Sequence, residues 1–119
     1  MVVIIAGEKN FENRVKKFLE DEGYWFVKFF ANAYTKKGVP DILACCNGYF
    51  LAVEVKAQNG RPSDLQKWNI QKIQQSGGYG VILYPDQFDD FKELVHHIGN
   101  YDKHFSLEIM NRINERWVK

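Results

Sequence analysis

The chain has 119 residues, of which 45% are hydrophobic and 15% are aromatic, and its formal net charge is +1. That length gives one domain with a real core, and the aromatic content argues against disorder. A nearly neutral charge at first counts against a nucleic-acid partner, but acids committed to a metal site would be offset by bound cations. We therefore expect a single domain over residues 1–119, with its binding partner undecided by charge alone.

The sequence has no apolar run of the length that a membrane span needs, so we expect no membrane partner. Its first ten residues lack the basic leader and the hydrophobic region of a signal peptide. Cys45 and Cys46 are adjacent in a predicted strand and should point to opposite faces, so we expect small core side chains and no disulfide between them. A cytoplasmic protein is the expectation, and a virus-encoded protein acting in its host cell would fit the compact length.

The first part of the chain predicts a helix followed by a strand. Phe11, Val15, Phe18 and Leu19 fall at i, i+4, i+7 and i+8, which is the spacing of one helix face. The short apolar run over residues 2–6 is either a frayed start or an edge strand. In chain order, we expect a helix over residues 8–22, strands over 24–30, 40–46 and 49–56, a helix over 63–75 and a strand over 79–84.

A hairpin is the most specific of these predictions. Residues 40–56 read PDILACCNGYFLAVEVK, and Asn47-Gly48 is the dipeptide most typical of a two-residue hairpin turn. If these two residues form the turn, Cys46 pairs with Tyr49. Counting outward along both strands then places one acid directly opposite another at the open end of the hairpin.

Those acids are Asp41 and Glu54, and paired residues of an antiparallel ladder have Cβ atoms about 4.5–5.5 Å apart. Alternation along the second strand adds Lys56 to the face that carries Glu54. Two facing carboxylates are unfavourable unless something lies between them, and a divalent cation is the natural candidate. A surface cluster of ion pairs is the competing interpretation.

The remainder of the chain predicts a mixed sheet and further helices. A helix between the third and fourth strands indicates a parallel crossover. Residues 88–98 have the spacing of a core-facing helix. An i+4 series of Phe105, Ile109, Ile113 and Trp117 marks a second helix, whose stripe is usually core and otherwise a partner surface.

Gly38-Val39-Pro40-Asp41, followed by Glu54-Val55-Lys56 and Gln66, resembles the PD-(D/E)xK nuclease superfamily. The pattern looks most like its VRR-NUC branch and is similar in layout to the archaeal Holliday-junction resolvases. The resemblance covers about residues 8–84. It implies an α/β (α+β) fold with a restriction-endonuclease-like core, in which helices flank a central mixed four-stranded sheet in the order αβββαβ. A C-terminal helical extension over about 88–119 lies outside the resemblance.

The resemblance also implies a metal site for Mg²⁺, with Mn²⁺ able to substitute. Asp41, Glu54 and the main-chain carbonyl of Val55 would be its ligands, which fits the preference of Mg²⁺ for oxygen and for one or two carboxylates. Glu12 matches a glutamate on the first helix of the resolvases that reaches the metal directly or through water. Glu8, one turn earlier, could share or take that role.

Two further residues complete the implied catalytic set. Lys56 would orient the attacking water or stabilise charge developing on the phosphate. Gln66 matches a glutamine that borders the active site in related sequences. It also completes a capping box with Ser63, and a side chain committed to that cap is not expected to reach a phosphate as well.

The loop before the proline–aspartate strand should run beside the site. Its lysines could hold the DNA backbone and its tyrosine could stack or contact phosphate, with solvated charges as the alternative. The candidate DNA-binding residues are Tyr34, Thr35, Lys36, Lys37 and Arg61.

Together these features predict a Mg²⁺-dependent, structure-selective DNA endonuclease that hydrolyses phosphodiester bonds. Branched DNA such as a Holliday junction is the substrate that the resemblance implies. Symmetric cutting needs two active sites and hence a homodimer, built on the C-terminal helices or on the aromatic run over residues 24–30. The alternatives are a restriction- or repair-type nuclease that needs a partner, a non-catalytic DNA-binding module, and a small α/β binding protein with no nucleic-acid role.

Overall fold

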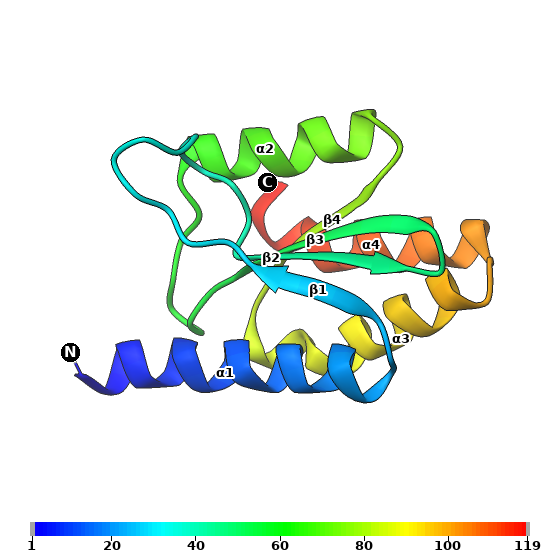
Figure 1. Ribbon diagram of the computed structural model, residues 1–119, viewed down its shortest axis with the longest axis horizontal. Coiled ribbons are helices and arrows are strands. Elements are labelled where there is room, and N and C mark those ends of the chain that lie inside the picture. Colours follow the sequence, from blue (N-terminus) through cyan, green and yellow to red (C-terminus); the bar gives the residue numbers. More distant parts are fainter. Residues whose placement is uncertain (1, 119) are drawn as a thin grey trace.

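A computed structural model describes residues 2–118 of the chain, and residues 7–118 in side-chain detail. Figure 1 shows helices on both sides of one twisted sheet. The order αβββαβ with additional C-terminal helices is the one predicted. The elements are α1 (Val2–Asp21), β1 (Trp25–Lys28), β2 (Ile42–Cys46), β3 (Tyr49–Val55), α2 (Asp64–Gln75), β4 (Tyr79–Leu83), a 3₁₀ turn η1 (Pro85–Gln87), α3 (Phe88–Gly99) and α4 (Lys103–Val118).

The sheet is mixed, as expected, with strand order β1-β2-β3-β4. The first two pairs are antiparallel, and β3 and β4 are parallel, joined by the crossover helix α2. Both turn residues of the hairpin, Asn47 and Gly48, have positive φ (50° and 92°), which is the geometry of the turn that matches strand twist. The ladder therefore starts at Cys46 opposite Tyr49, as predicted.

The helices bury the two faces of this sheet unequally. On one face, Phe11 and Val15 of α1 and Phe91 of α3 join the main core with the inward residues of the strands. On the other face α2 covers the side of β4, where Ile70 packs with Ile82 in a smaller cluster. The β1 side of that second face stays open, and Trp25 is 65% exposed there. The candidate site lies at one end of this arrangement, where β2 begins and β3 ends.

Helix α4 closes the free edge of β4. Asn114 is buried, and its amide accepts the N–H of Ile82 (3.2 Å) and donates to the carbonyl of Gly80 (2.9 Å). The indole N–H of Trp117 donates to the same Asn114 oxygen at 2.8 Å. An unpaired strand edge is a template for unwanted strand pairing, and this side chain occupies it.

The apolar stripe predicted on α4 is largely core, because Ile109, Ile113 and Trp117 are buried. Phe105 is an exception with 49% of its surface exposed. It lies in the first turn of the helix and packs against the His97 ring, with ring centres 5.5 Å apart.

Three smaller expectations are wrong. Residues 2–6 are neither a strand nor a frayed end, since α1 begins at Val2 and continues through Gly7, as helices extend readily once nucleated. The aromatic strand is shorter than predicted, because only Trp25–Lys28 pair with β2. Cys46 is buried but Cys45 is exposed on the open part of the sheet. Within residues 2–118, no helix combines the length and the apolar character needed to cross a membrane.

Candidate active site

The predicted carboxylate pair forms at the open end of the hairpin. The β2–β3 ladder runs to Ile42 opposite Val53, so Asp41 and Glu54 are the next positions outward. The carboxylate of Asp41 is fixed by the Val55 N–H, which donates to its Oδ2 at 2.8 Å. Its main-chain carbonyl accepts the N–H of Phe29 at 2.8 Å. Asp41 is therefore held by β1 and β3 together.

Glu54 is the buried member of the pair, with 3% of its surface exposed. Burial and, after it, the neighbouring charge of Asp41 raise the pKa of its carboxyl to about 8, against the opposing effect of Lys56. An acid in such a place is ionised at neutral pH only when a positive charge compensates it. A divalent cation would supply that charge.

Lys56 and Gln66 both reach Glu54 through the same oxygen, Oε2. The ammonium of Lys56 lies 3.5 Å from it, and the Gln66 Nε2 donates to it at 3.0 Å. Gln66 also completes the capping box of α2, because its Oε1 accepts the N–H of Ser63 at 2.9 Å. The cap and the contact with Glu54 coexist, because the amide uses its oxygen for the cap and its nitrogen for Glu54.

Lys28 joins the cluster from β1 and was not predicted from the sequence. Its ammonium lies 2.8 Å from Glu12 Oε1 and 3.3 Å from Asp41 Oδ1. Burial lowers the pKa of Lys28, but the Glu12 hydrogen bond and the Asp41 charge outweigh it and raise the pKa overall. A signal existed, since Lys28 is the one charged residue in the apolar run over residues 24–30.

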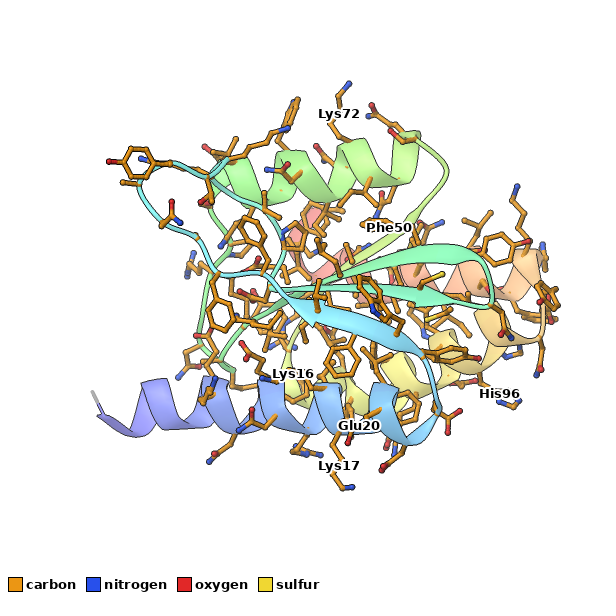
Figure 2. The ribbon with its side chains drawn as sticks, viewed as in Figure 1. Lys16, Lys17, Glu20, Phe50, Lys72 and His96 are labelled. Carbon is orange, nitrogen blue, oxygen red and sulfur yellow. The ribbon has the colours of Figure 1, made fainter. Side chains whose placement is uncertain are left out.

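Glu12 itself is buried on α1, at 6% exposure. Besides Lys28 it pairs with Lys16 (3.2 Å) and Lys9 (3.5 Å). Burial raises the pKa of its carboxyl, but the hydrogen bonds from Lys28 and Lys16 outweigh burial and lower it. Figure 2 shows Lys16 on the side of α1 that faces the sheet and Lys17 pointing away. The Glu12 carboxyl is thus ionised and forms ion pairs with three lysines.

Glu8 lies one turn before Glu12 and faces the same cluster. Burial raises the pKa of its carboxyl, and its charge interacts with Lys56, Asp41, Glu12 and Lys28. With Lys9, Glu12 and Lys28 it lines a hollow of about 330 Å³. In contrast to Glu12, no ion pair joins Glu8 to another residue in the part of the chain described in side-chain detail. Of the two glutamates, Glu8 is therefore the one whose carboxylate is not engaged in an ion pair within the part of the chain described in side-chain detail.

The donor set fits a hard divalent cation. Among residues described in side-chain detail, no three His, Cys, Asp or Glu side chains converge on one point. Mg²⁺ does not need three protein side chains at one point, since it keeps several water ligands and binds through one or two carboxylates. Asp41 and Glu54 would hold it, with the carbonyl of Val55 beside them. The raised pKa of Glu54, which is buried beside Asp41, is the observation that favours a cation, because its carboxyl is ionised at neutral pH only with a further positive charge nearby.

The predicted DNA-binding residues lie in two places. Tyr34 is almost fully exposed at 98%, and Lys36 lies with its ammonium 5.5 Å from the centre of the Trp68 ring. The hydroxyl of Thr35 is occupied within the loop, where it bonds the backbone of Asn32. The carbonyl of Lys37 accepts the amide of Asn69, which ties the loop to α2.

Arg61 lies apart from that loop, beyond β3. It lines a polar hollow of about 570 Å³ together with Lys67, Tyr84 and Arg116. Arg116 is held there by an ion pair with Asp86 at 2.5 Å. The basic side chains thus form two separate groups, one with Lys36 beside α2 and one with Arg61 around the polar hollow.

One family model matches this chain, over residues 6–79, and it is described as archaeal Holliday junction resolvase (hjc). The matched segment runs from α1 to the first residue of β4. It contains all the carboxylates and lysines of the candidate site, which are Glu8, Glu12, Lys28, Asp41, Glu54 and Lys56. A search of curated proteins finds no match.

Proposed function

The chain belongs to the archaeal Holliday junction resolvase family, and on that premise we propose that it is a Mg²⁺-dependent endonuclease that cuts branched DNA. Family membership supports nuclease activity and DNA binding, with a restriction-endonuclease-like fold. The metal dependence, the preference for branched DNA and the assignment to the VRR-NUC branch go beyond that and are part of the proposal.

The observation that carries the proposal is the buried carboxylate of Glu54 beside Asp41, with Lys56 3.5 Å from Glu54 Oε2. Lys28 lies 3.3 Å from Asp41 and Lys56 lies 3.5 Å from Glu54, yet burial and the Asp41 charge still raise the pKa of Glu54 to about 8. A further positive charge is therefore needed for both carboxyls to be ionised at neutral pH. Asp41, Glu54 and Lys56 are the groups that metal-assisted phosphodiester hydrolysis requires.

In the proposed mechanism, a bound divalent cation supplies Lewis acidity at the scissile phosphate and makes water a better nucleophile. Asp41 and Glu54 would hold that cation, and the Val55 amide and Gln66 fix the orientation of the two carboxylates. Lys56 donates hydrogen bonds to the attacking water or to the phosphate oxygens as charge develops on them. Lys28 contacts both Glu12 and Asp41 and offsets the repulsion between these two carboxylates.

Resolution of a four-way junction takes two cuts, so we propose a homodimer with one site in each copy. The exposure of apolar side chains favours one of the two surfaces that the sequence suggested for the dimer interface. The apolar stripe of the C-terminal helices is mostly buried within the chain, whereas Trp25 (65%) and Val27 (39%) of β1 expose apolar side chains. The aromatic strand is therefore the surface that we assign to the second copy.

The test is a cleavage assay on four-way junction, flap, duplex and single-stranded DNA with Mg²⁺, Mn²⁺ or EDTA. The junction should be cut only with metal. Asp41→Asn and Lys56→Ala should each lower the rate by about 100-fold or more, as loss of a group acting on the transition state does. Lys17→Ala, an exposed lysine on the outer side of α1, is the matched control and should cut normally.

The alternatives give different results in the same assay. Tight junction binding without cutting by wild type would identify a non-catalytic module. Cutting that appears only with a second protein would identify a partner-dependent repair or restriction nuclease. Failure to bind any DNA at low salt, where phosphate contacts are strongest, would refute a nucleic-acid role.

A further inference from the structure

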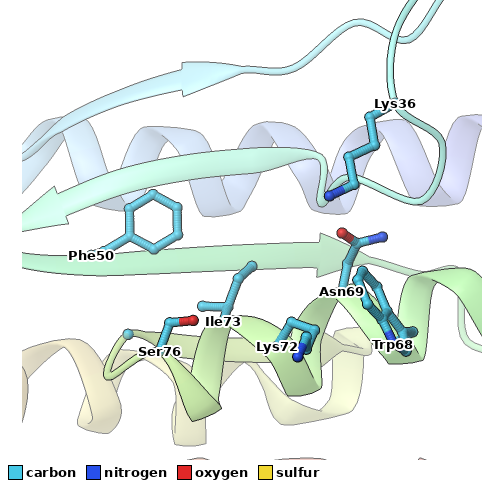
Figure 3. Close-up of a pocket in the computed structure, with 8 residues that line it drawn as sticks. Lys36, Phe50, Trp68, Asn69, Lys72, Ile73 and Ser76 are labelled. Atoms are coloured by element: carbon cyan, nitrogen blue, oxygen red, sulfur yellow. The ribbon is translucent and has the colours of Figure 1, made fainter.

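A groove lies between α2 and β3, on the same sheet face as Glu54. Its volume is about 460 Å³, and Figure 3 shows the side chains along it. Phe50 of β3 and Trp68 and Ile73 of α2 provide apolar walls, and Lys36, Asn69 and Lys72 provide polar groups. We call it the Trp68 groove.

The aromatic residues of this groove are open to solvent and flanked by positive charge. Trp68 and Phe50 are each 45% exposed, although large aromatic side chains usually bury most of their surface. The ammonium groups of Lys36 and Lys72 lie 5.5 and 5.7 Å from the centre of the Trp68 ring. None of the residues that line the groove is acidic. Such a surface is complementary to a planar ring attached to an anion.

The loop over residues 29–41 is held against α2 at this point. This contact positions Lys36 of the loop over the Trp68 ring. Gly38 has φ of +77°, and a Cβ there would lie 2.8 Å from Leu65 Cγ and from Asn69 Nδ2. The Asn69 amide donates to the carbonyls of Leu65 (2.9 Å) and Lys37 (3.3 Å). This uses its N–H groups and leaves its oxygen as the acceptor that it can offer a ligand.

The groove and the candidate active site share helix α2. Gln66 contacts Glu54, and Asn69, which lines the groove, lies three residues later and hence beside Gln66 on the helix surface. At about 1.5 Å of rise per residue, Lys72 lies about 9 Å from Gln66 along the axis. One stacked strand advances about 3.4 Å per nucleotide, so the distance from Gln66 to Lys72 along the helix corresponds to two or three nucleotides.

We propose that the Trp68 groove binds an unpaired nucleotide of the DNA strand that enters the candidate active site. The base stacks on Trp68, the Asn69 oxygen accepts a base N–H, and Lys36 and Lys72 contact the flanking phosphates. Stacking on an aromatic side chain needs an open base face, which a base-paired and stacked nucleotide does not offer. A second copy of the chain fits less well, since a two-fold contact centred here would bring these lysines toward their own copies.

This inference rests on the proposed function, and its test is designed to separate the two. Binding is measured in EDTA, without cleavage, by fluorescence anisotropy with an oligothymidine of about eight nucleotides, a blunt duplex, and four-way junctions with and without two unpaired thymidines at the crossover. The variants are Trp68→Ala, Trp68→Phe and Lys72→Ala. Phe105→Ala, an aromatic of similar exposure (49%) on α4, is the control.

Trp68→Ala should weaken binding of the oligothymidine and of the unpaired junction about tenfold and leave duplex affinity unchanged. Trp68→Phe should restore it to within about twofold, because phenylalanine keeps a stacking face. Lys72→Ala should reduce the slope of log affinity against log salt by about 0.7 on the single strand. Phe105→Ala should match wild type in every arm.

Equal binding of oligothymidine by wild type and Trp68→Ala would overturn the inference, as would an equal loss on duplex. A change in oligomeric state of Trp68→Ala by sedimentation, with strand affinity intact, would show that a second copy covers the groove. If wild type cuts no junction with Mg²⁺ but still binds oligothymidine through Trp68, the groove stands and the nuclease proposal falls. If wild type cuts and Trp68→Ala binds every substrate normally, the reverse holds.

Discussion

Glu54→Gln isolates the energetic consequence of burying a carboxyl beside Asp41. The unfolded carboxyl titrates near the ordinary value of 4.5 and the folded one near 8, so between those pH values the folded chain holds one more proton than the unfolded chain. Stability in EDTA should therefore fall as pH rises through this window. The slope for one proton is about 1.4 kcal/mol per pH unit, or about 2 kcal/mol between pH 5.5 and 7.

The assay is urea or thermal unfolding of wild type and Glu54→Gln at matched pH in EDTA. For a domain of this size about 1 kcal/mol shifts Tm by about 4 °C, so wild type should lose about 8 °C more than the variant between pH 5.5 and 7. Excess Mg²⁺ should restore wild type at pH 7, since a cation that binds only the folded state stabilises it, and should leave the variant unchanged. Parallel pH profiles for the two proteins in EDTA would refute the raised pKa of the buried Glu54 carboxyl.

Two other substitutions test particular contacts. Lys28→Met removes the ammonium that lies 3.3 Å from Asp41 and that would compete with a cation for this carboxylate. The apparent Mg²⁺ affinity, measured by titration calorimetry, should therefore rise about threefold, while junction cutting slows. Weaker Mg²⁺ binding by the variant would contradict this competition. Asn114→Ala leaves the buried N–H of Ile82 and the carbonyl of Gly80 without their partner, and should lower the free energy of unfolding by about 3 kcal/mol. Urea titration measures that loss, and a change below about 1 kcal/mol would mean that the amide does not close the strand edge.

The hairpin and its facing acids were predictable because their determinants are local. A two-residue turn sets the register of both strands, and a period of two then places every side chain. The capping box of α2 was predictable for the same reason. The match of the predicted element order to the structure rests on these two signals and on the periodicity of α1.

Lys28, the role of Asn114 and the double role of Gln66 depend on contacts between distant segments. Lys28 reaches Asp41 through the pairing of β1 with β2, across a long connection whose length does not fix a register. From the sequence pattern alone, Asn114 is predicted to be a polar surface residue of an amphipathic helix. Its hydrogen-bond partners on β4 are more than thirty residues away in the chain, so the pattern does not reveal them. Gln66 satisfies two partners at once, which a pattern of residue types does not encode.

The capping box of α2 has a consequence for how the site assembles. The Ser63 amide hydrogen is held by the same Gln66 side chain that contacts Glu54, so fraying of the first turn of α2 should also release the Glu54 carboxyl from Gln66. Hydrogen–deuterium exchange at that single amide should therefore report on the order of the candidate active site. Any partner or DNA strand that clamps the start of α2 would align the carboxylate without touching it.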